Sequence, residues 1–171
     1  MFNNVRRTKF LLVRNTSGQL QATVKPLINA WFVAKGRGRL GSWRLSDGAG
    51  VFDMRFKLPD GTVVHSEFTL QPADTPDDVR RLLSLEASAA WLEEMREIDK
   101  SIFESLQGRV MRFPSREDGG IKFSGIIGST TPPPMGHWLQ ELIANPPPTM
   151  SVHIQPPAVL DDGSLTQEQL D

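Results

Sequence analysis

The chain has 171 residues, a formal net charge of −1 and no cysteine. This length suits one domain with a hydrophobic core, and the lack of cysteine excludes disulfides and thiolate zinc sites. The three histidines are scattered and predict no metal cluster. No apolar run approaches the roughly 20 residues of a membrane-spanning helix, and residues 1–10 lack a signal peptide's apolar segment. We therefore predict a soluble protein of the cytoplasm with no membrane partner.

Charge is unevenly distributed along the chain. No acidic residue precedes Asp47, whereas nine basic residues do: Arg6, Arg7, Lys9, Arg14, Lys25, Lys35, Arg37, Arg39 and Arg44. Such a segment favours contact with phosphate in a nucleotide or nucleic acid, although a solvated basic face is an equally simple reading. Residues 158–171 carry four acids and no base, so we predict a domain over residues 1–157 and a flexible acidic tail over 158–171.

The first two elements are a strand and a helix. Residues 9–13 (KFLLV) form a short apolar run closed by turn-forming residues 15–18, which predicts a buried strand. Helical spacing of apolar residues follows over 20–31, interrupted by Pro26. Because proline removes a backbone donor, the helix is expected to kink or to begin there, with Thr23 near its cap.

A basic loop and a hairpin come next. Residues 35–46 are rich in glycine and arginine without periodicity, which predicts an exposed loop. Residues 51–58 and 62–70 alternate apolar and polar side chains around Pro59-Asp60-Gly61, a typical hairpin turn. We expect this hairpin at a sheet edge or as a small insertion.

Strands and helices then alternate. Thr75, followed by proline and two acids, predicts a helix start, and that helix should end near Glu86. The pattern next predicts a strand over 87–92, a helix ending at Gly108, a strand over 121–127, a helix over 137–144 and a last strand over 150–154. This order predicts an α/β fold with a largely parallel sheet.

Two consecutive acids follow the strand predicted over residues 87–92. Glu93 and Glu94 would lie at the carboxyl edge of a parallel sheet, where such folds bind their ligands. In a Walker B arrangement, one acid holds the water shell of Mg²⁺ and its neighbour orients the water that attacks phosphate. The simpler alternative is a solvated boundary between a strand and a helix.

Four segments in one order resemble the large terminase subunits of tailed bacteriophages, the motors that package viral DNA. They are Val13-Arg14-Asn15-Thr16 with Gln19-Leu20, the Ala89–Glu94 strand, Gly108–Val110 with Arg112–Ser115, and Gly125–Trp138. Together they extend over residues 5–145. The resemblance implies an incomplete P-loop NTPase-like sheet of the ASCE type, with flanking helices and a β-hairpin insertion.

The resemblance also implies roles for individual residues. Glu93 matches the Walker B acid that holds Mg²⁺ through water, and Glu94 matches the catalytic glutamate. Thr130 and Thr131 match the coupling motif that senses ATP and transmits hydrolysis to DNA movement. Arg14 can approach phosphate, or it can be a structural arginine in a salt bridge. Implied partners are double-stranded DNA, the small terminase subunit, the portal protein and further copies in a ring, in the cytoplasm of the bacterial host.

The chain departs from the family pattern at several points. Glu93 stands where the family has aspartate or asparagine, Thr131 where asparagine is usual, and Pro134 where a polar residue is common. No Gly-x-x-x-x-Gly-Lys-Ser/Thr loop occurs in the sequence, and in the family that loop precedes the first matching strand. We therefore expect a fragment without the phosphate-binding loop and without the nuclease domain.

A second glycine pattern, G-x-G-x-x-G over residues 36–41, follows a predicted helix and opens none, so it fails the context of a dinucleotide site. We interpret the segment as a basic loop in which Lys35, Arg37, Arg39 and Arg44 contact the DNA backbone, with ordinary surface as the alternative.

Two functions remain open at this stage. The first is part of the packaging ATPase, and the second is a non-catalytic remnant or module that binds DNA, the small terminase or the portal. A phosphate-loop codon pattern in frame upstream of Met1 would favour the enzyme.

Overall fold

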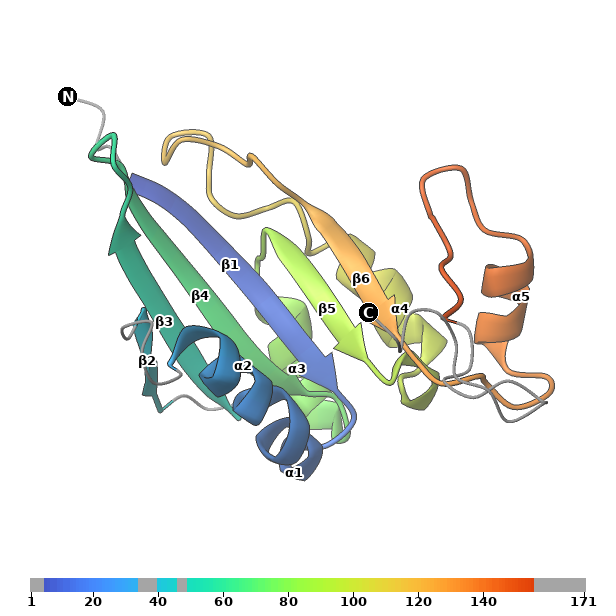
Figure 1. The fold of residues 1–171 in the computed structure, drawn as a ribbon. Coiled ribbons are helices and arrows are strands. Elements are labelled where there is room, and N and C mark those ends of the chain that lie inside the picture. The colour runs from blue at the N-terminus through green and yellow to red at the C-terminus, as the bar shows by residue number, and fades with distance from the viewer. Residues whose placement is uncertain (1–4, 34–39, 46–48, 156–171) are drawn as a thin grey trace, which may run out of the picture. The chain divides into compact units, whose positions relative to one another are not determined.

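The computed structural model describes residues 5–33, 40–45 and 49–155. These belong to two units, residues 1–133 and 134–171. The first unit contains a six-stranded sheet with the order β2-β3-β4-β1-β5-β6 (Figure 1). The strands are β1 (Val5–Arg14), β2 (Gly41–Arg44), β3 (Gly50–Lys57), β4 (Val63–Pro72), β5 (Ala89–Glu93) and β6 (Gly125–Ser129). The helices are α1 (Ser17–Gln19), the π-helix η1 (Leu20–Val24), α2 (Lys25–Phe32), α3 (Pro76–Ser84), the short 3₁₀-helix η2 (Met95–Glu97), α4 (Lys100–Gln107) and, in the second unit, α5 (Trp138–Ala144).

The sheet is mixed and mostly parallel. Strand β1 pairs in parallel with β4 and β5, and β5 pairs in parallel with β6. Strand β3 is antiparallel to both of its neighbours, β2 and β4. The predicted α/β class with a largely parallel sheet is confirmed, and the strand before Glu93 pairs in parallel with the strand before Thr130.

The hairpin lies in the sheet differently from our expectation. Its turn at Asp60 and Gly61 is as predicted, and the backbone hydrogen bond from Thr62 lowers the pKa of the Asp60 carboxyl. The prediction of an edge position or small insertion is wrong for both strands, because β3 pairs with β2 and β4, and β4 pairs with β3 and β1. Parallel pairing with β1 depends on a distant segment, which the alternation within the hairpin does not reveal.

The first helical segment starts earlier than predicted. Thr16, not Thr23, is the N-cap: its hydroxyl accepts from the Gln19 amide, and the Gln19 side chain accepts from the Thr16 amide. Pro26 is accommodated in the first turn of α2, directly after the π-helical turn of η1. A π-helical turn changes the hydrogen-bond pattern locally, so the chain stays helical through this region.

The predicted basic loop is partly a strand. Residues 41–44 form β2 against β3, so the loop prediction is wrong there, while residues 34–39 and 46–48 lie outside the described residues. Gly41 is required at this position, because a Cβ atom would lie 2.3 Å from the Asp53 carbonyl oxygen and 2.7 Å from the Phe52 ring. Pairing with β3 thus overrides the weak strand propensity of a glycine-rich sequence.

The remaining elements agree with the sequence patterns in type and differ at their ends. Helix α3 begins at the predicted Thr75 cap, with a capping box to Asp78, and α4 ends at Gly108 as predicted. Strand β6 begins at Gly125 instead of residue 121, and residues 150–154 form no strand, so that prediction is wrong. In the second unit, the predicted helix α5 is capped by His137, whose Nδ1 accepts from the Leu139 amide.

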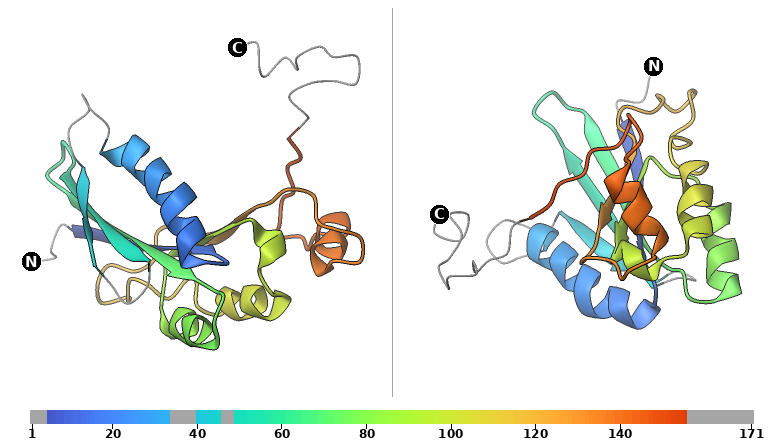
Figure 2. Two further views of the ribbon diagram at one scale, coloured as in Figure 1. Left: turned by 90° about the horizontal axis from the view of Figure 1, so that it is seen from below. Right: turned by 90° about the vertical axis from the view of Figure 1, so that its right-hand side faces the viewer.

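Helices cover both faces of the sheet (Figure 2). On one face, η1 and α2 pack on an apolar cluster that comprises Leu12, Leu20, Val24, Ile28, Ala49, Phe52 and Leu70. Helices α3 and α4 lie on the other face, where Leu11, Val13 and Leu92 are buried. No helix among the described residues is long and apolar enough to cross a membrane.

Candidate active site at the carboxyl edge of the sheet

The strands β5 and β6 bring the predicted acids and threonines to one edge. Glu93 is the last residue of β5 and is paired with Ser129, the last residue of β6. The next residues along the chain are Glu94 after β5 and Thr130 and Thr131 after β6, so all three lie at the same edge of the sheet. The carboxyl ends of parallel strands are where α/β sheets bind ligands, so this edge is the candidate site.

Glu94 is held in an unusual backbone conformation by contacts from the loop after β6. Its φ of 52° and ψ of 56° place it in the left-handed region, which typically costs about 1–2 kcal/mol for a residue with a side chain. Its Oε2 accepts from the Thr131 hydroxyl at 3.1 Å and the Thr131 amide at 3.4 Å, and lies 3.6 Å from Arg96 Nε. The carboxylate therefore has a defined position beside Thr131.

Thr130 connects the loop after β6 to the residues that follow Glu94. Its hydroxyl oxygen accepts from the Arg96 amide at 3.3 Å, and Arg96 Nη1 donates to the Pro132 carbonyl at 3.4 Å. The first helical turn after Glu94 and the loop after β6 are thus hydrogen-bonded to each other. A shift of either segment would move Glu94 relative to Thr131.

Glu93 is neutralised by a basic side chain from β1. Arg14 Nη1 donates to Glu93 Oε2 at 3.1 Å, and both side chains are largely buried, with exposed fractions of 13% and 19%. The Thr23 hydroxyl lies 3.1 Å from the same carboxylate oxygen and accepts from Arg14 Nη1 at 2.7 Å. Of the two readings of Arg14, this geometry corresponds to the structural salt bridge.

Thr23 is the residue of this site that sequence patterns missed. It was expected as a helix cap, yet η1 places it over the carboxyl end of β5. No local signal indicates this role, because Thr23 and Glu93 are 70 residues apart in the sequence.

The edge supplies part of what Mg²⁺ and ATP need. Carboxylate oxygens are the ligands that Mg²⁺ prefers, and Glu94 offers one beside hydroxyl groups. Glu93 fits that role less well, because Arg14 and the Thr23 hydroxyl both lie 3.1 Å from its Oε2, whereas Arg96 lies farther from Glu94, at 3.6 Å. Phosphates require a cradle of backbone amides and a lysine, and the 171 residues contain no Gly-x-x-x-x-Gly-Lys-Ser/Thr loop.

A second polar cluster lies on the sheet, at the hairpin. Asp53, His65 and Glu67 have side-chain donor atoms within 4.8 Å of one another. The hairpin register about Asp60 places Asp53 opposite Glu67, so the printed sequence contained the signal for this grouping. Arg44 pairs with both acids, at 2.5 Å from Asp53 and 3.0 Å from Glu67.

The structure corrects the predicted loop position of Arg44, while its contact with DNA stays a prediction. Arg44 was expected in a flexible loop facing DNA, but it lies on β2, where Asp53 and Glu67 compensate its charge. The other three predicted DNA contacts, Lys35, Arg37 and Arg39, fall outside the described residues.

Comparison with known proteins identifies the fold. No family model matches the sequence, and no curated protein matches it either. Among solved structures, the large terminase of a thermophilic bacteriophage matches with a TM-score of 0.55 and 15% identity, over 83% of this chain and 32% of that chain. The same terminase in complex with ADP gives a TM-score of 0.48 at 14% identity, over 75% of this chain and 27% of that one. The large terminase ATPase domain of a Thermus phage gives 0.40 at 17% identity, over 80% and 52%.

The first of these matches is the one with a TM-score above one half. The chain spans about a third of the length of that terminase. Its fold is therefore similar to that of part of a phage large terminase: a mostly parallel sheet with helices on both faces.

Proposed function

We propose that this chain is part of a phage terminase large subunit, the ATP-driven motor that packages double-stranded viral DNA into procapsids. One observation carries the proposal: Glu94, at the carboxyl end of β5, accepts hydrogen bonds from Thr131 after β6. Its support is the terminase-like fold, together with the general rule that parallel sheets bind ligands at the carboxyl ends of their strands. The working motor would act in the host cytoplasm as a ring, with the small terminase and the portal protein as further partners.

In this function Glu94 would orient the water that attacks the terminal phosphate of ATP, and Mg²⁺, when bound, would supply positive charge to the phosphates. The hydrogen bonds from Thr131 to Glu94 then couple the chemical step to the loop after β6. Arg14 and Thr23 fix Glu93 and thereby the end of β5, on which the position of Glu94 depends.

The phosphate cradle would have to come from a further strand. A phosphate-binding loop connects a strand to a helix, and β6 is an edge strand whose Ile127 is 62% exposed. A parallel strand added beside β6 would bring its loop next to Glu94 and Thr131. The other side of β5 is already occupied by β1.

The 171-residue chain alone is expected to release phosphate from ATP only at background rate. The acidic edge handles metal and water, but nothing in the sequence binds the phosphates in the manner of a phosphate-binding loop. Phosphate release and nucleotide affinity of the purified chain measure this directly.

The control for that prediction is Glu94→Gln, which keeps the size of the side chain. Turnover by the native chain that Glu94→Gln abolishes would contradict the prediction and reveal another phosphate site. The proposed function itself is tested by joining the chain to a strand and loop of the GxxxxGK[ST] type. ATPase activity should then appear, and the Glu94→Gln substitution in the fusion should abolish it. A fusion that folds and binds nucleotide, but whose ATPase activity is the same with and without Glu94→Gln, would overturn the proposed function.

A non-catalytic module that binds DNA, the small terminase or the portal is the alternative. It is favoured by the missing phosphate loop and by the ion pair that neutralises Glu93. Weak binding of the chain to DNA, the small terminase or the portal, together with a fusion that shows no ATPase activity, would support this alternative.

The basic segment predicts weak, sequence-independent DNA binding. Lys35, Arg37 and Arg39 are interleaved with glycines, which allow the backbone to approach phosphates closely. Replacement of Arg37 and Arg39 by alanine should lower the salt dependence of binding by about one unit per lost contact. A filter-binding titration of duplex DNA at several salt concentrations measures this, and equal affinity of the native chain and the variant would exclude the loop from the DNA path.

A further inference from the structure

Three cationic or protonatable side chains form a row across the sheet, far from the acidic edge. Arg7 of β1 lies opposite His65 of β4, and His65 lies opposite Arg55 of β3. We propose that this cationic row binds the phosphate backbone of duplex DNA. The inference rests on the proposed packaging function and assigns it a contact surface on the sheet itself.

The pairing register places the row on one face. Residues opposite each other on neighbouring strands point to the same face, and successive residues alternate. Thr8 and Ser66, the next residues along β1 and β4, are hydrogen-bonded to each other at 2.7 Å on the opposite face, which α2 covers farther along the strands. The cationic row therefore lies on the face that carries α3 and α4, at the hairpin end that those helices leave uncovered (Figures 1 and 2).

The two arginines of the row are available to a ligand. Arg7 and Arg55 are both exposed, and neither has an ion-pair partner within the described ranges. The nearby acids Asp53 and Glu67 share one cation, Arg44, and His65 Nε2 lies 3.4 Å from Asp53 Oδ1. Arg44 offsets part of the negative charge beside the row, so the two arginines Arg7 and Arg55 are the members that attract phosphate.

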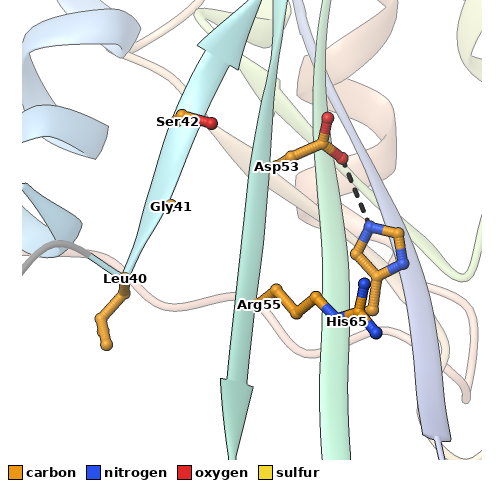
Figure 3. A pocket seen from close by; sticks show the side chains of 6 residues that line it. All are labelled: Leu40, Gly41, Ser42, Asp53, Arg55 and His65. Carbon is orange, nitrogen blue, oxygen red and sulfur yellow. Dashed lines mark hydrogen bonds and ion pairs between the residues drawn. The ribbon is translucent and has the colours of Figure 1, made fainter.

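An open hollow adjoins the row. It has a volume of about 540 Å³ and is lined by Leu40, Gly41, Ser42, Asp53, Arg55 and His65. Figure 3 shows the Arg55 guanidinium beside the His65 ring, with Ser42 on the neighbouring strand. Guanidinium and hydroxyl groups are usual donors to phosphate oxygens, whereas His65 Nε2 already lies 3.4 Å from Asp53 Oδ1.

The shape of the surface decides the mode of binding. Neighbouring strands are about 4.8 Å apart, so the three side chains extend over about 10 Å and can engage more than one phosphate. A sheet face offers no helix or two-stranded ribbon that could enter the major groove. Binding should therefore follow the backbone and be independent of base sequence, with a steep dependence on salt.

The test compares three double variants of the 171-residue chain on two unrelated duplexes of equal length. Arg7→Ala/Arg55→Ala removes the row, Lys100→Ala/Arg116→Ala removes two cations elsewhere, and Arg37→Ala/Arg39→Ala removes the loop cations. Fluorescence anisotropy at several salt concentrations gives affinity and salt slope. The row variant should lose about two units of slope and roughly a hundredfold in affinity at about 50 mM salt, equally for both duplexes. The Lys100/Arg116 variant should match the native chain.

Row and matched-control variants with the same slope would overturn the inference, and so would a native chain that binds no DNA. Thermal melting followed by circular dichroism verifies folding, and Arg7→Gln/Arg55→Gln replaces the alanine pair if the latter unfolds. These residues make no contact with Glu93 or Glu94, so a negative result here leaves the Glu94-dependent ATPase test of the proposed function standing. The loop variant shows separately whether the loop contributes.

Discussion

Replacement of Phe52 by alanine is expected to lower the free energy of unfolding by about 3–5 kcal/mol. Phe52 is fully buried at the centre of the apolar cluster under α2, with ring-centroid distances of 6.0 Å to Phe32, 5.3 Å to Trp43 and 6.4 Å to Phe68. Alanine loses the burial of the ring and leaves a cavity that three rigid aromatic neighbours cannot fill by small movements. Urea denaturation followed by circular dichroism should show a lower midpoint with an unchanged slope.

The matched control is Leu45→Ala, because Leu45 is 99% exposed. Its free energy of unfolding should change by no more than about 0.5 kcal/mol. The free energy of unfolding of Phe52→Leu should lie between those of the two alanine variants, since leucine retains part of the buried volume. A Phe52→Ala variant as stable as Leu45→Ala would mean that α2 does not pack on the sheet through this cluster.

Arg14→Ala is expected to lower the free energy of unfolding by about 2–3 kcal/mol. This is somewhat less than the loss expected when one partner of a fully buried ion pair is removed, because both side chains are partly exposed. The substitution leaves the Glu93 carboxylate largely buried without its cation, at 19% exposure, and one Thr23 hydroxyl cannot compensate a charge. It also removes the hydrogen bonds by which Arg14 of β1 joins Thr23 of η1 to Glu93 at the end of β5, directly before Glu94. The same denaturation experiment measures the loss.

A double-mutant cycle separates the ion pair from packing. Arg14→Ala and Glu93→Gln should show a coupling energy of about 1–3 kcal/mol, because each partner loses its value when the other is absent. Replacement of both by apolar residues, Arg14→Met with Glu93→Leu, should recover most of the stability. The control is Arg116→Ala, at an exposed position. If Arg14→Ala lowered the free energy of unfolding no more than Arg116→Ala does, the ion pair would contribute nothing to the stability of the fold.

The sequence alone determined those features whose physics is local. The helix at Thr75 could be predicted because all its signals lie within one turn: Thr75 and Asp78 accept hydrogen bonds from free amides, and Pro76 has no amide that needs a partner. The hairpin turn at Asp60 and Gly61 follows from backbone angles that few other residues adopt. The acidic edge was predictable too, because alternating strands and helices bring the ends of β5 and β6 together.

The tertiary structure alone decided the features that depend on partners distant in sequence. Strand β2 exists because β3 supplies its hydrogen bonds, which a glycine-rich sequence does not reveal. Arg14 and Thr23 lie 79 and 70 residues before Glu93, and the pairing of β1 with β5 and the path of η1 bring them to it. The cationic row likewise requires the parallel register of β1 and β4. Local patterns encode hydrogen bonds and backbone angles within a few residues, whereas long-range charge pairing depends on which strands become neighbours.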